Sequence, residues 1–174
     1  PKSKIRTSSQ NSAEENDDIR PKIRLKFDSP SGYHRQLLVT ADDNASNNFD
    51  MGYDAPSLDN SVADMFWLIN ESSYVIQGVN NFNYDQELPL GLKTKETGLV
   101  RIIIDEFENL PENFKVFIND NIYGETYEIS KNQPFETELD AGEYYNRFSL
   151  IFQPRLLTLD EIELTNGINT FINN

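Results

Sequence analysis

The sequence contains no cysteine and only one histidine among its 174 residues. The lack of cysteine excludes disulfides, thiol nucleophiles, iron–sulfur sites and thiolate zinc sites. It does not exclude export, because a domain of this size holds together by packing alone. A single histidine cannot supply the two or three imidazoles of a catalytic zinc site, and no Gly-x-Ser-x-Gly elbow accompanies it. We therefore expect His34 to pack or to bond a loop, and we expect no enzymatic activity.

Positive charge is also scarce, because 15 basic residues stand against 29 acidic ones and give a net charge of −14. Such an excess repels nucleic-acid phosphates and anionic membrane surfaces, so no nucleic-acid partner is expected. No apolar run approaches the roughly 20 residues of a membrane span. The first residues also lack the basic-then-apolar order of a signal peptide. We expect a fragment or a processed piece, and in an exported parent the signal peptide would lie upstream of Pro1.

Composition divides the chain into three regions. Residues 1–20 contain too few apolar side chains to offset the entropy of ordering them, so we assign them to a flexible linker. Residues 21–155 carry the pattern of a folded domain. Residues 156–174 form a tail, in which a short apolar alternation over 157–164 favours docking as an exposed edge strand and an Asn-rich end is expected to project or to meet a partner.

The folded region alternates apolar and polar residues with a period of two, as half-buried strands do. Ile23, Leu25 and Phe27 give the clearest example. Turn-forming residues separate nine such segments, which predicts an all-β fold: an antiparallel β-sandwich of about nine strands with a jelly-roll-like topology. The expected strands cover residues 22–27, 35–41, 65–69, 74–79, 88–92, 99–104, 114–118, 122–129 and 145–152.

The same alternation predicts which side chains are buried. Trp67 lies in a wholly apolar segment and is expected inside, and Arg147, next to the core residue Phe148, is expected to pair with a carboxylate or to bond loop carbonyls. The predicted core comprises Leu25, Phe27, Leu37, Val39, Trp67, Ile69, Ile76, Ile102, Ile104, Val116, Ile118, Phe148, Leu150 and Phe152.

The long loop at 42–63 is rich in Asn, Asp and Ser, and loops of this length are functional or disordered. Asp42, Asp43, Asp50 and Asp54 are the candidate metal ligands, because calcium prefers carboxylate and carbonyl oxygens. The EF-hand order fails, since Asn47 stands where glycine belongs. The alternative is that these side chains close turns by bonding their own backbone. No other cofactor is expected.

Acidic pairs and aromatic side chains leave two further alternatives open. Glycosidases need two carboxylates facing one sugar, but the cluster at residues 105–108 is interpreted as a solvated turn. Exposed aromatics can stack on sugar rings, and Phe82 and Tyr84, which lie between Asn and Asp residues, are the surface candidates.

Seven segments follow one another in a characteristic order. They are Gly32-Tyr-His-Arg-Gln-Leu-Leu38, Asn48-Phe-Asp-Met-Gly-Tyr-Asp-Ala55, Asp64-Met-Phe-Trp-Leu-Ile69, Tyr74-Val-Ile-Gln-Gly78, Leu88-Pro-Leu-Gly-Leu-Lys93, Gly98-Leu-Val-Arg-Ile-Ile-Ile-Asp105 with Glu108-Asn-Leu-Pro111, and Gly142-Glu-Tyr-Tyr-Asn-Arg-Phe148. Over residues 21–155 this series resembles the β-sandwich domain that precedes the C-terminal sorting signal of surface proteins exported by the type IX secretion system of Bacteroidota. Adhesins and gliding-associated proteins are among the carriers of that domain.

The resemblance implies a secreted, cell-surface or outer-membrane-associated protein. Its expected partners are the outer-membrane translocon or shuttle components of that system and the upstream modules of the same parent. The tail looks like the opening of the sorting signal, although it reads Phe171-Ile-Asn-Asn where Tyr-Pro-Asn-Pro is commoner. The candidate partner-binding residues there are Asn166, Gly167, Ile168, Asn169 and Phe171.

Three hypotheses from different classes follow. The leading one is a non-catalytic C-terminal module for targeting, anchoring and display, with roles in adhesion or gliding motility. The second is a carbohydrate-binding β-sandwich module, assisted by calcium, whose partners are glycans. The third is a hydrolase that acts through acidic pairs.

Overall fold

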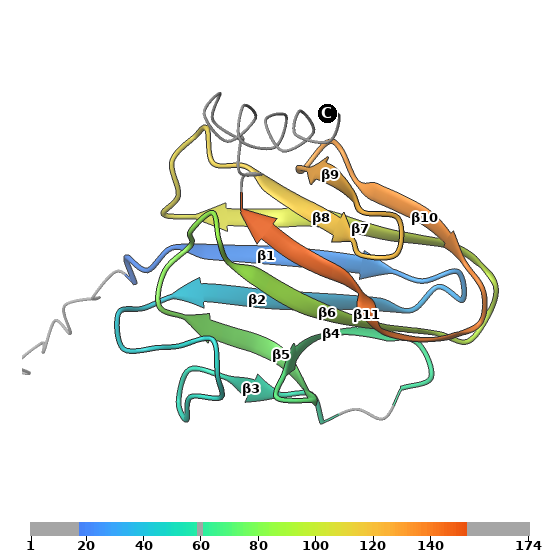
Figure 1. Cartoon of the computed structure of the whole chain (residues 1–174), viewed down its shortest axis with the longest axis horizontal. Helices are drawn as coiled ribbons and strands as arrows, with labels where there is room; N and C mark the ends of the chain where they lie inside the picture. The colour runs from blue at the N-terminus through green and yellow to red at the C-terminus, as the bar shows by residue number, and fades with distance from the viewer. Residues whose placement is uncertain (1–17, 59–60, 153–174) are drawn as a thin grey trace, which may run out of the picture.

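The computed structural model describes residues 18–58 and 61–152, which contain eleven strands and no helix (Figure 1). None of these residues therefore forms a helix long and apolar enough to cross a membrane. The strands are β1 (Lys22–Asp28), β2 (His34–Ala41), β3 (Ala55–Pro56), β4 (Asp64–Ile69), β5 (Ser72–Val79), β6 (Glu87–Thr94), β7 (Gly98–Glu108), β8 (Val116–Asp120), β9 (Glu125–Ile129), β10 (Phe135–Leu139) and β11 (Gly142–Phe152).

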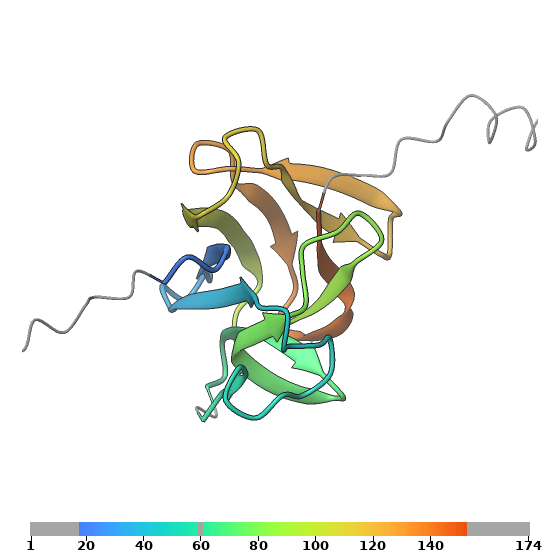
Figure 2. The ribbon, with the colours of Figure 1, turned by 90° about the vertical axis from the view of Figure 1, so that its left-hand side faces the viewer.

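All strands belong to one hydrogen-bonded sheet with the order β10-β7-β1-β2-β5-β4-β6-β11-β8-β9, and β3 pairs with β5 beside this path. Neighbours along the path are antiparallel except β2 and β5, which are parallel. The two ends of the path come together, since the Tyr127 ring of β9 lies 5.1 Å from the Phe135 ring of β10. The sheet therefore curves round almost to closure, and its strands surround a common interior (Figure 2).

The structure confirms the all-β class but not the division into two sheets. Each of the nine predicted strands is present to within a few residues, and β3 and β10 are additional. Hydrogen bonding continues from strand to strand through one sheet, so the barrel-like arrangement differs from the expected sandwich. Alternation shows which side chains face inward, but an inward face looks the same whether two sheets stack or one sheet curves.

The interior is filled by alternate side chains from nearly all strands. Trp67 is fully buried, and its indole Nε1 donates a hydrogen bond of 2.9 Å to the carbonyl oxygen of Leu38. Thirteen of the fourteen predicted core residues are buried, but Ile76 is only half-buried. Ile76 stands opposite Ala55 of β3, whereas Val75 and Val79 of the same strand contact the core. The prediction for Ile76 was wrong because the consecutive apolar residues there leave the strand's inward face ambiguous.

Candidate functional site beside the β11 bulge

The pairing of β11 with β6 is interrupted by a bulge, at which side chains point out of the sheet. Tyr144 stands opposite Leu92 of β6, but the next pair along is Phe148 with Leu90. Tyr145, Asn146 and Arg147 therefore face Gly91 alone. Bulges of this kind re-aim side chains and occur often beside functional sites.

A buried ion pair fixes the far end of this bulge. The Arg147 guanidinium donates from Nε and Nη2 to Oδ2 of Asp120, at 3.0 and 2.9 Å. The Asp120 side chain is only 3% exposed, and this bond raises the pKa of Arg147 although burial opposes the shift. The guanidinium also lies over the rings of Tyr123 and Phe148. The predicted pairing of Arg147 with a carboxylate is confirmed.

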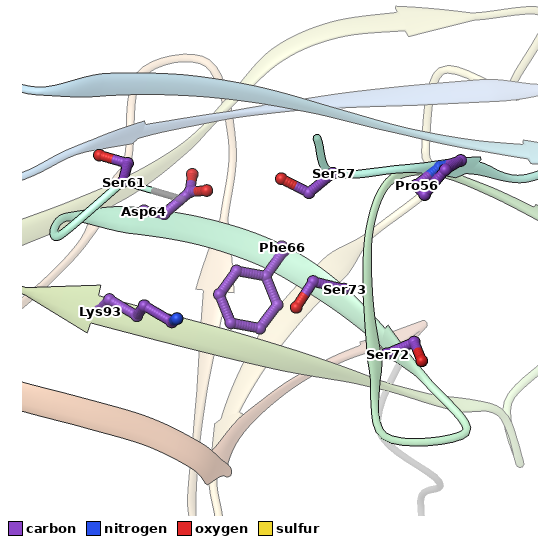
Figure 3. Close-up of a pocket in the computed structure, with 8 residues that line it drawn as sticks. All are labelled: Pro56, Ser57, Ser61, Asp64, Phe66, Ser72, Ser73 and Lys93. Carbon is purple, nitrogen blue, oxygen red and sulfur yellow. The ribbon is translucent and has the colours of Figure 1, made fainter. Parts of the chain in front are cut away.

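The bulge brings Tyr145 against Phe66 of β4, with ring centroids 5.9 Å apart. The Lys93 ammonium of β6 lies 5.8 Å from the Phe66 centroid and 5.9 Å from that of Tyr145, and Figure 3 shows it directed toward the Phe66 ring. Gly91 makes room for that ring, since a Cβ at this position would lie 2.1 Å from a Phe66 carbon. Phe66 is thus buried although it does not belong to the interior core.

Hydrogen bonding holds the Tyr145 ring in place. Its hydroxyl donates a bond of 2.6 Å to Oε2 of Glu143, which raises the pKa of Tyr145 and lowers that of Glu143. The Lys93 ammonium lies 3.4 Å from the other Glu143 oxygen. Burial acts against the charge on Lys93, but Tyr145 and Glu143 together leave its pKa raised.

A hollow of about 350 Å³ opens over Phe66, and its wall includes four serines, Asp64 and Lys93 (Figure 3). Asp64 is neutralised, because its Oδ1 lies 2.6 Å from Nε of Arg35 and its Oδ2 accepts a bond from Nη2. Oγ of Ser57 is buried and has no hydrogen-bond partner among the described residues. A buried hydroxyl without a partner is uncommon in folded proteins and calls for an explanation.

A second hollow of about 570 Å³ neighbours the first, and Ser73 belongs to the walls of both. Its rim includes Tyr145, Asn146 and the β4–β5 turn. In that turn Asn70 and Glu71 both adopt positive φ, 49° and 65°, as the tight two-residue turns of hairpins require. The two hollows together are called the β4–β11 groove.

Three of the four aspartates predicted as metal ligands, namely Asp42, Asp50 and Asp54, accept hydrogen bonds from the loop itself or from β5. The Asp54 carboxylate accepts bonds from the backbone N–H groups of Asp50 and Gly78, at 2.6 and 2.7 Å. Asp50 accepts from Ser46, and Asp42 accepts from Asn44, which lowers the pKa of Asp42. Within residues 18–58 and 61–152, no three His, Asp or Glu side chains gather as metal ligands would. These contacts agree with loop closure, and calcium at Asp42, Asp43, Asp50 and Asp54 stays a prediction.

The other predicted site residues lie apart from the groove. Tyr84 is 62% exposed as expected, but Phe82 is not a free surface ring, because it packs against Phe152 with centroids 4.8 Å apart. His34 bonds Asp28 through Nδ1, in agreement with a structural role. The tail candidates Asn166, Gly167, Ile168, Asn169 and Phe171 lie outside the described residues.

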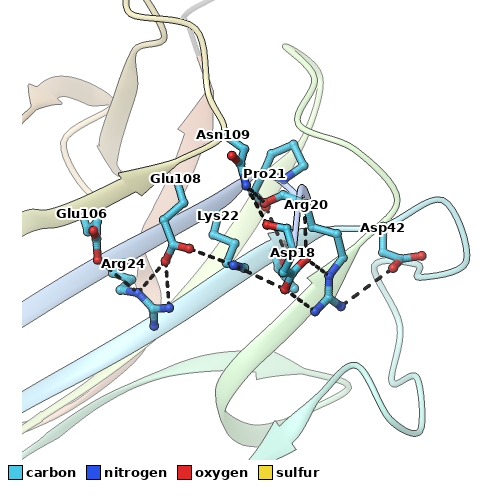
Figure 4. Close-up of polar contacts among 10 residues, drawn as sticks. Asp18, Arg20, Pro21, Lys22, Arg24, Asp42, Glu106, Glu108 and Asn109 are labelled. Atoms are coloured by element: carbon cyan, nitrogen blue, oxygen red, sulfur yellow. Dashed lines mark hydrogen bonds and ion pairs between the residues drawn. The ribbon is translucent and has the colours of Figure 1, made fainter. Parts of the chain in front are cut away.

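A second polar cluster ties the N-terminal approach to β1 and β7 (Figure 4). Lys22 and Arg24 both reach Glu108, each at 2.8 Å, and Lys22 also lies 3.3 Å from Asp18. Arg20 pairs with Asp18 at 2.7 Å. Residues 18–20, assigned above to the linker, thus make defined contacts. The cluster at residues 105–108 forms the end of β7 and not a turn, although Asp105 and Glu106 are exposed to solvent as expected.

The groove residues Ser57, Lys93 and Tyr145 were missed, because each is an isolated polar or amphipathic residue without a motif. One signal was present in the sequence. Continuing the inward alternation of Phe148, Leu150 and Phe152 backwards places Asn146 inside, and a buried asparagine there would need partners. That conflict indicates a bulge.

Comparison with known proteins places the chain in a family whose description names no function. The model of a family described as Domain of unknown function (DUF8693) matches residues 3–152. No curated protein and no solved structure matches the chain. Since the match spans most of the chain, the protein belongs to the DUF8693 family of domains of unknown function.

Proposed function

We propose that this chain is a non-catalytic module for targeting, anchoring and display at the C-terminal side of a cell-surface protein that the type IX secretion system exports. The observation that supports the proposal is the position of the seven ordered segments in the structure. They lie on or beside β2 to β7 and β11, and several of their residues make contacts that hold these strands in place.

Three of these segments illustrate the point. Gly91, within the segment 88–93, provides the space that Phe66 occupies. Arg147, within 142–148, neutralises the buried Asp120. Asp54, within 48–55, bonds the backbone of β5 at Gly78. Each of these positions therefore has a structural role, as expected of a resemblance that carries no active-site residue.

The arrangement of the described chain also suits display. Ile19 lines one apolar hollow and Phe152 lines another, and Phe82 and Phe114 belong to the walls of both. The polypeptide therefore approaches and leaves the sheet at the same end. Modules attached on either side would meet there, away from the β4–β5 turn that borders the groove.

Fusion to a reporter tests the proposal. A periplasm-directed luciferase carrying this domain in its native C-terminal context is expected at the cell surface, where added protease removes it. The matched control is the same fusion in a host without the translocon, where the reporter is expected to stay protected in the periplasm. Retention inside a secretion-competent host, with the fusion folded and its C-terminus complete, would overturn the proposal.

A further inference from the structure

We infer that the β4–β11 groove binds an uncharged glycan, with Tyr145 as the ring on which a sugar stacks. This inference goes beyond the proposed function, which concerns export and display and needs no ligand. It stands on the shape, the free polar groups and the charge of the groove.

The polar groups of the groove match those of a sugar. A hydroxyl or a carboxamide both donates and accepts hydrogen bonds, as sugar hydroxyls do. Ser57 Oγ is buried without a partner in the described part of the chain. The side chains of Asn70 and Asn146 are exposed on the rim, and none of the described residues hydrogen-bonds their amides. A ligand with several hydroxyl groups would bond the two exposed amides in place of water. The Ser57 hydroxyl is covered, so it would bond the ligand only after a small movement of the wall of the hollow.

The aromatic wall is already in place before any ligand arrives. Tyr145 keeps 37% of its surface exposed, while Phe66 and Lys93 pack against it and Glu143 accepts a hydrogen bond from its hydroxyl. A flat ring held in this way offers its face to the axial C–H groups of a pyranose. Because the ring is fixed beforehand, binding loses little side-chain entropy.

The charge of the groove selects against acidic sugars. Asp64 is paired with Arg35, and Lys93 is paired with Glu143. Glu71 on the rim has no such partner in the described residues and adds a negative charge. The chain as a whole carries −14. Carboxylated or sulfated polysaccharides would be repelled, which leaves neutral ones.

The dimensions indicate more than one sugar. The two hollows, of about 350 and 570 Å³, share Ser73, and the two rings in contact line one hollow each, Phe66 the first and Tyr145 the second. Pockets for compact ligands begin at about 300 Å³. An oligosaccharide that crosses Tyr145 would place one residue in each hollow.

Titration of the ¹⁵N-labelled full chain, residues 1–174, tests the inference. The probes are neutral cello-, xylo-, manno- and laminari-oligosaccharides of four to six sugars, with oligogalacturonate as the acidic counterpart. At least one neutral probe is expected to shift the amide signals of Ser57, Ser73, Lys93 and Asn146. Tyr145→Ala is expected to weaken that binding at least ten-fold, and Asn146→Ala about five-fold, as the loss of one hydrogen bond would.

Tyr84→Ala is the matched control, since it removes another exposed tyrosine outside the groove and should leave the affinity unchanged. The wild-type signal map keeps the test decisive even if Tyr145→Ala folds poorly. Silence toward all neutral probes, shifts confined to other surfaces, a preference for oligogalacturonate, or full affinity in folded Tyr145→Ala would each overturn the inference. None of these results bears on export of the reporter, so the two proposals fail separately.

Discussion

Two regions of the molecule are held by ion pairs in different surroundings. One is the Asp120–Arg147 pair at the bulge, and the other is the Asp18–Lys22–Glu108 cluster beside β1. The Asp120 and Arg147 side chains are 3% and 12% exposed. Glu108 is 28% exposed and Asp18 is 39% exposed. Distances between the charged atoms are similar in both places, so the geometry alone does not distinguish them.

Solvent access makes the difference. Removing one partner of a buried pair leaves the other charge without water or a counter-charge, which is strongly destabilising. At the surface, water replaces a lost partner, and exposed pairs contribute little. The bulge, and with it the groove, should therefore depend on Arg147, whereas the cluster beside β1 should adjust stability only slightly.

Arg147→Gln should produce the largest effect. It leaves Asp120 buried and unpaired, so we expect a loss of about 3–5 kcal/mol in the free energy of unfolding, measured by urea denaturation. Adding Asp120→Asn removes the stranded charge and should restore part of the loss. Arg24→Gln is the control, since it removes an arginine from the exposed cluster and should cost less than about 1 kcal/mol.

Equal losses in Arg147→Gln and Arg24→Gln would contradict the distinction between the two regions. Unchanged stability in Arg147→Gln together with failed surface delivery of the reporter would assign Arg147 to a recognition surface instead.

Gly91→Ala should have the next largest effect. The added methyl would meet the Phe66 ring, which has little freedom between Lys93 and Tyr145. Overpacking of this kind costs about 1–3 kcal/mol, and the lowered urea midpoint would show it. Phe66→Leu in the same chain should recover part of the loss. Gly142→Ala tests the same change in β11, where the nearest atoms are 3.9 Å away, and it should be nearly neutral.

The sequence predicts strands well where apolar residues alternate strongly, as over Ile23, Leu25 and Phe27. It missed β10, because Phe135 and Leu139 are its only buried apolar residues, and two such residues four apart suit more than one structure. Closure of the sheet was beyond prediction for a different reason. It depends on which strands become neighbours, such as the parallel pair β2 and β5, and local periodicity carries no such information.

The groove was harder to predict than the core. Ser57, Lys93 and Tyr145 come from separate parts of the chain. Their elements come together through the pairing of β3 with β5, of β5 with β4, of β4 with β6 and of β6 with β11. Arg147 was predictable because an arginine beside a core phenylalanine needs a partner. The identity of that partner, Asp120, required the register of β8 against β11.

Glu108→Gln should have a small effect that depends on salt. It removes one negative charge that Lys22 and Arg24 share, and exposed pairs of this type contribute about 0–1 kcal/mol. The difference from the wild type in thermal unfolding should shrink as the salt concentration rises from 0.02 M to roughly 0.5 M, because the screening length falls well below the separation of the cluster's more distant charges. A salt-independent loss would mean that Glu108 acts through packing.

The smallest effect we expect is the pH dependence of the difference in thermal unfolding between the wild type and Glu108→Gln. Hydrogen bonds from Lys22 and Arg24 lower the pKa of Glu108 below its usual 4.5, so the unfolded chain takes up its proton first as the pH falls. The stabilising contribution is then complete above the unfolded-state pKa and is lost as the pH drops through the lower, folded-state value. Thermal unfolding of the wild type and of Glu108→Gln should differ most near pH 6 and converge in strong acid. Asp18 remains in both proteins, so the part of its acid loss that comes from pairing with Arg20 cancels in the comparison. A gap that stays constant from pH 6 to about pH 2 would show that the charge on Glu108 contributes nothing, and the cluster would then hold the N-terminal approach through neutral contacts alone.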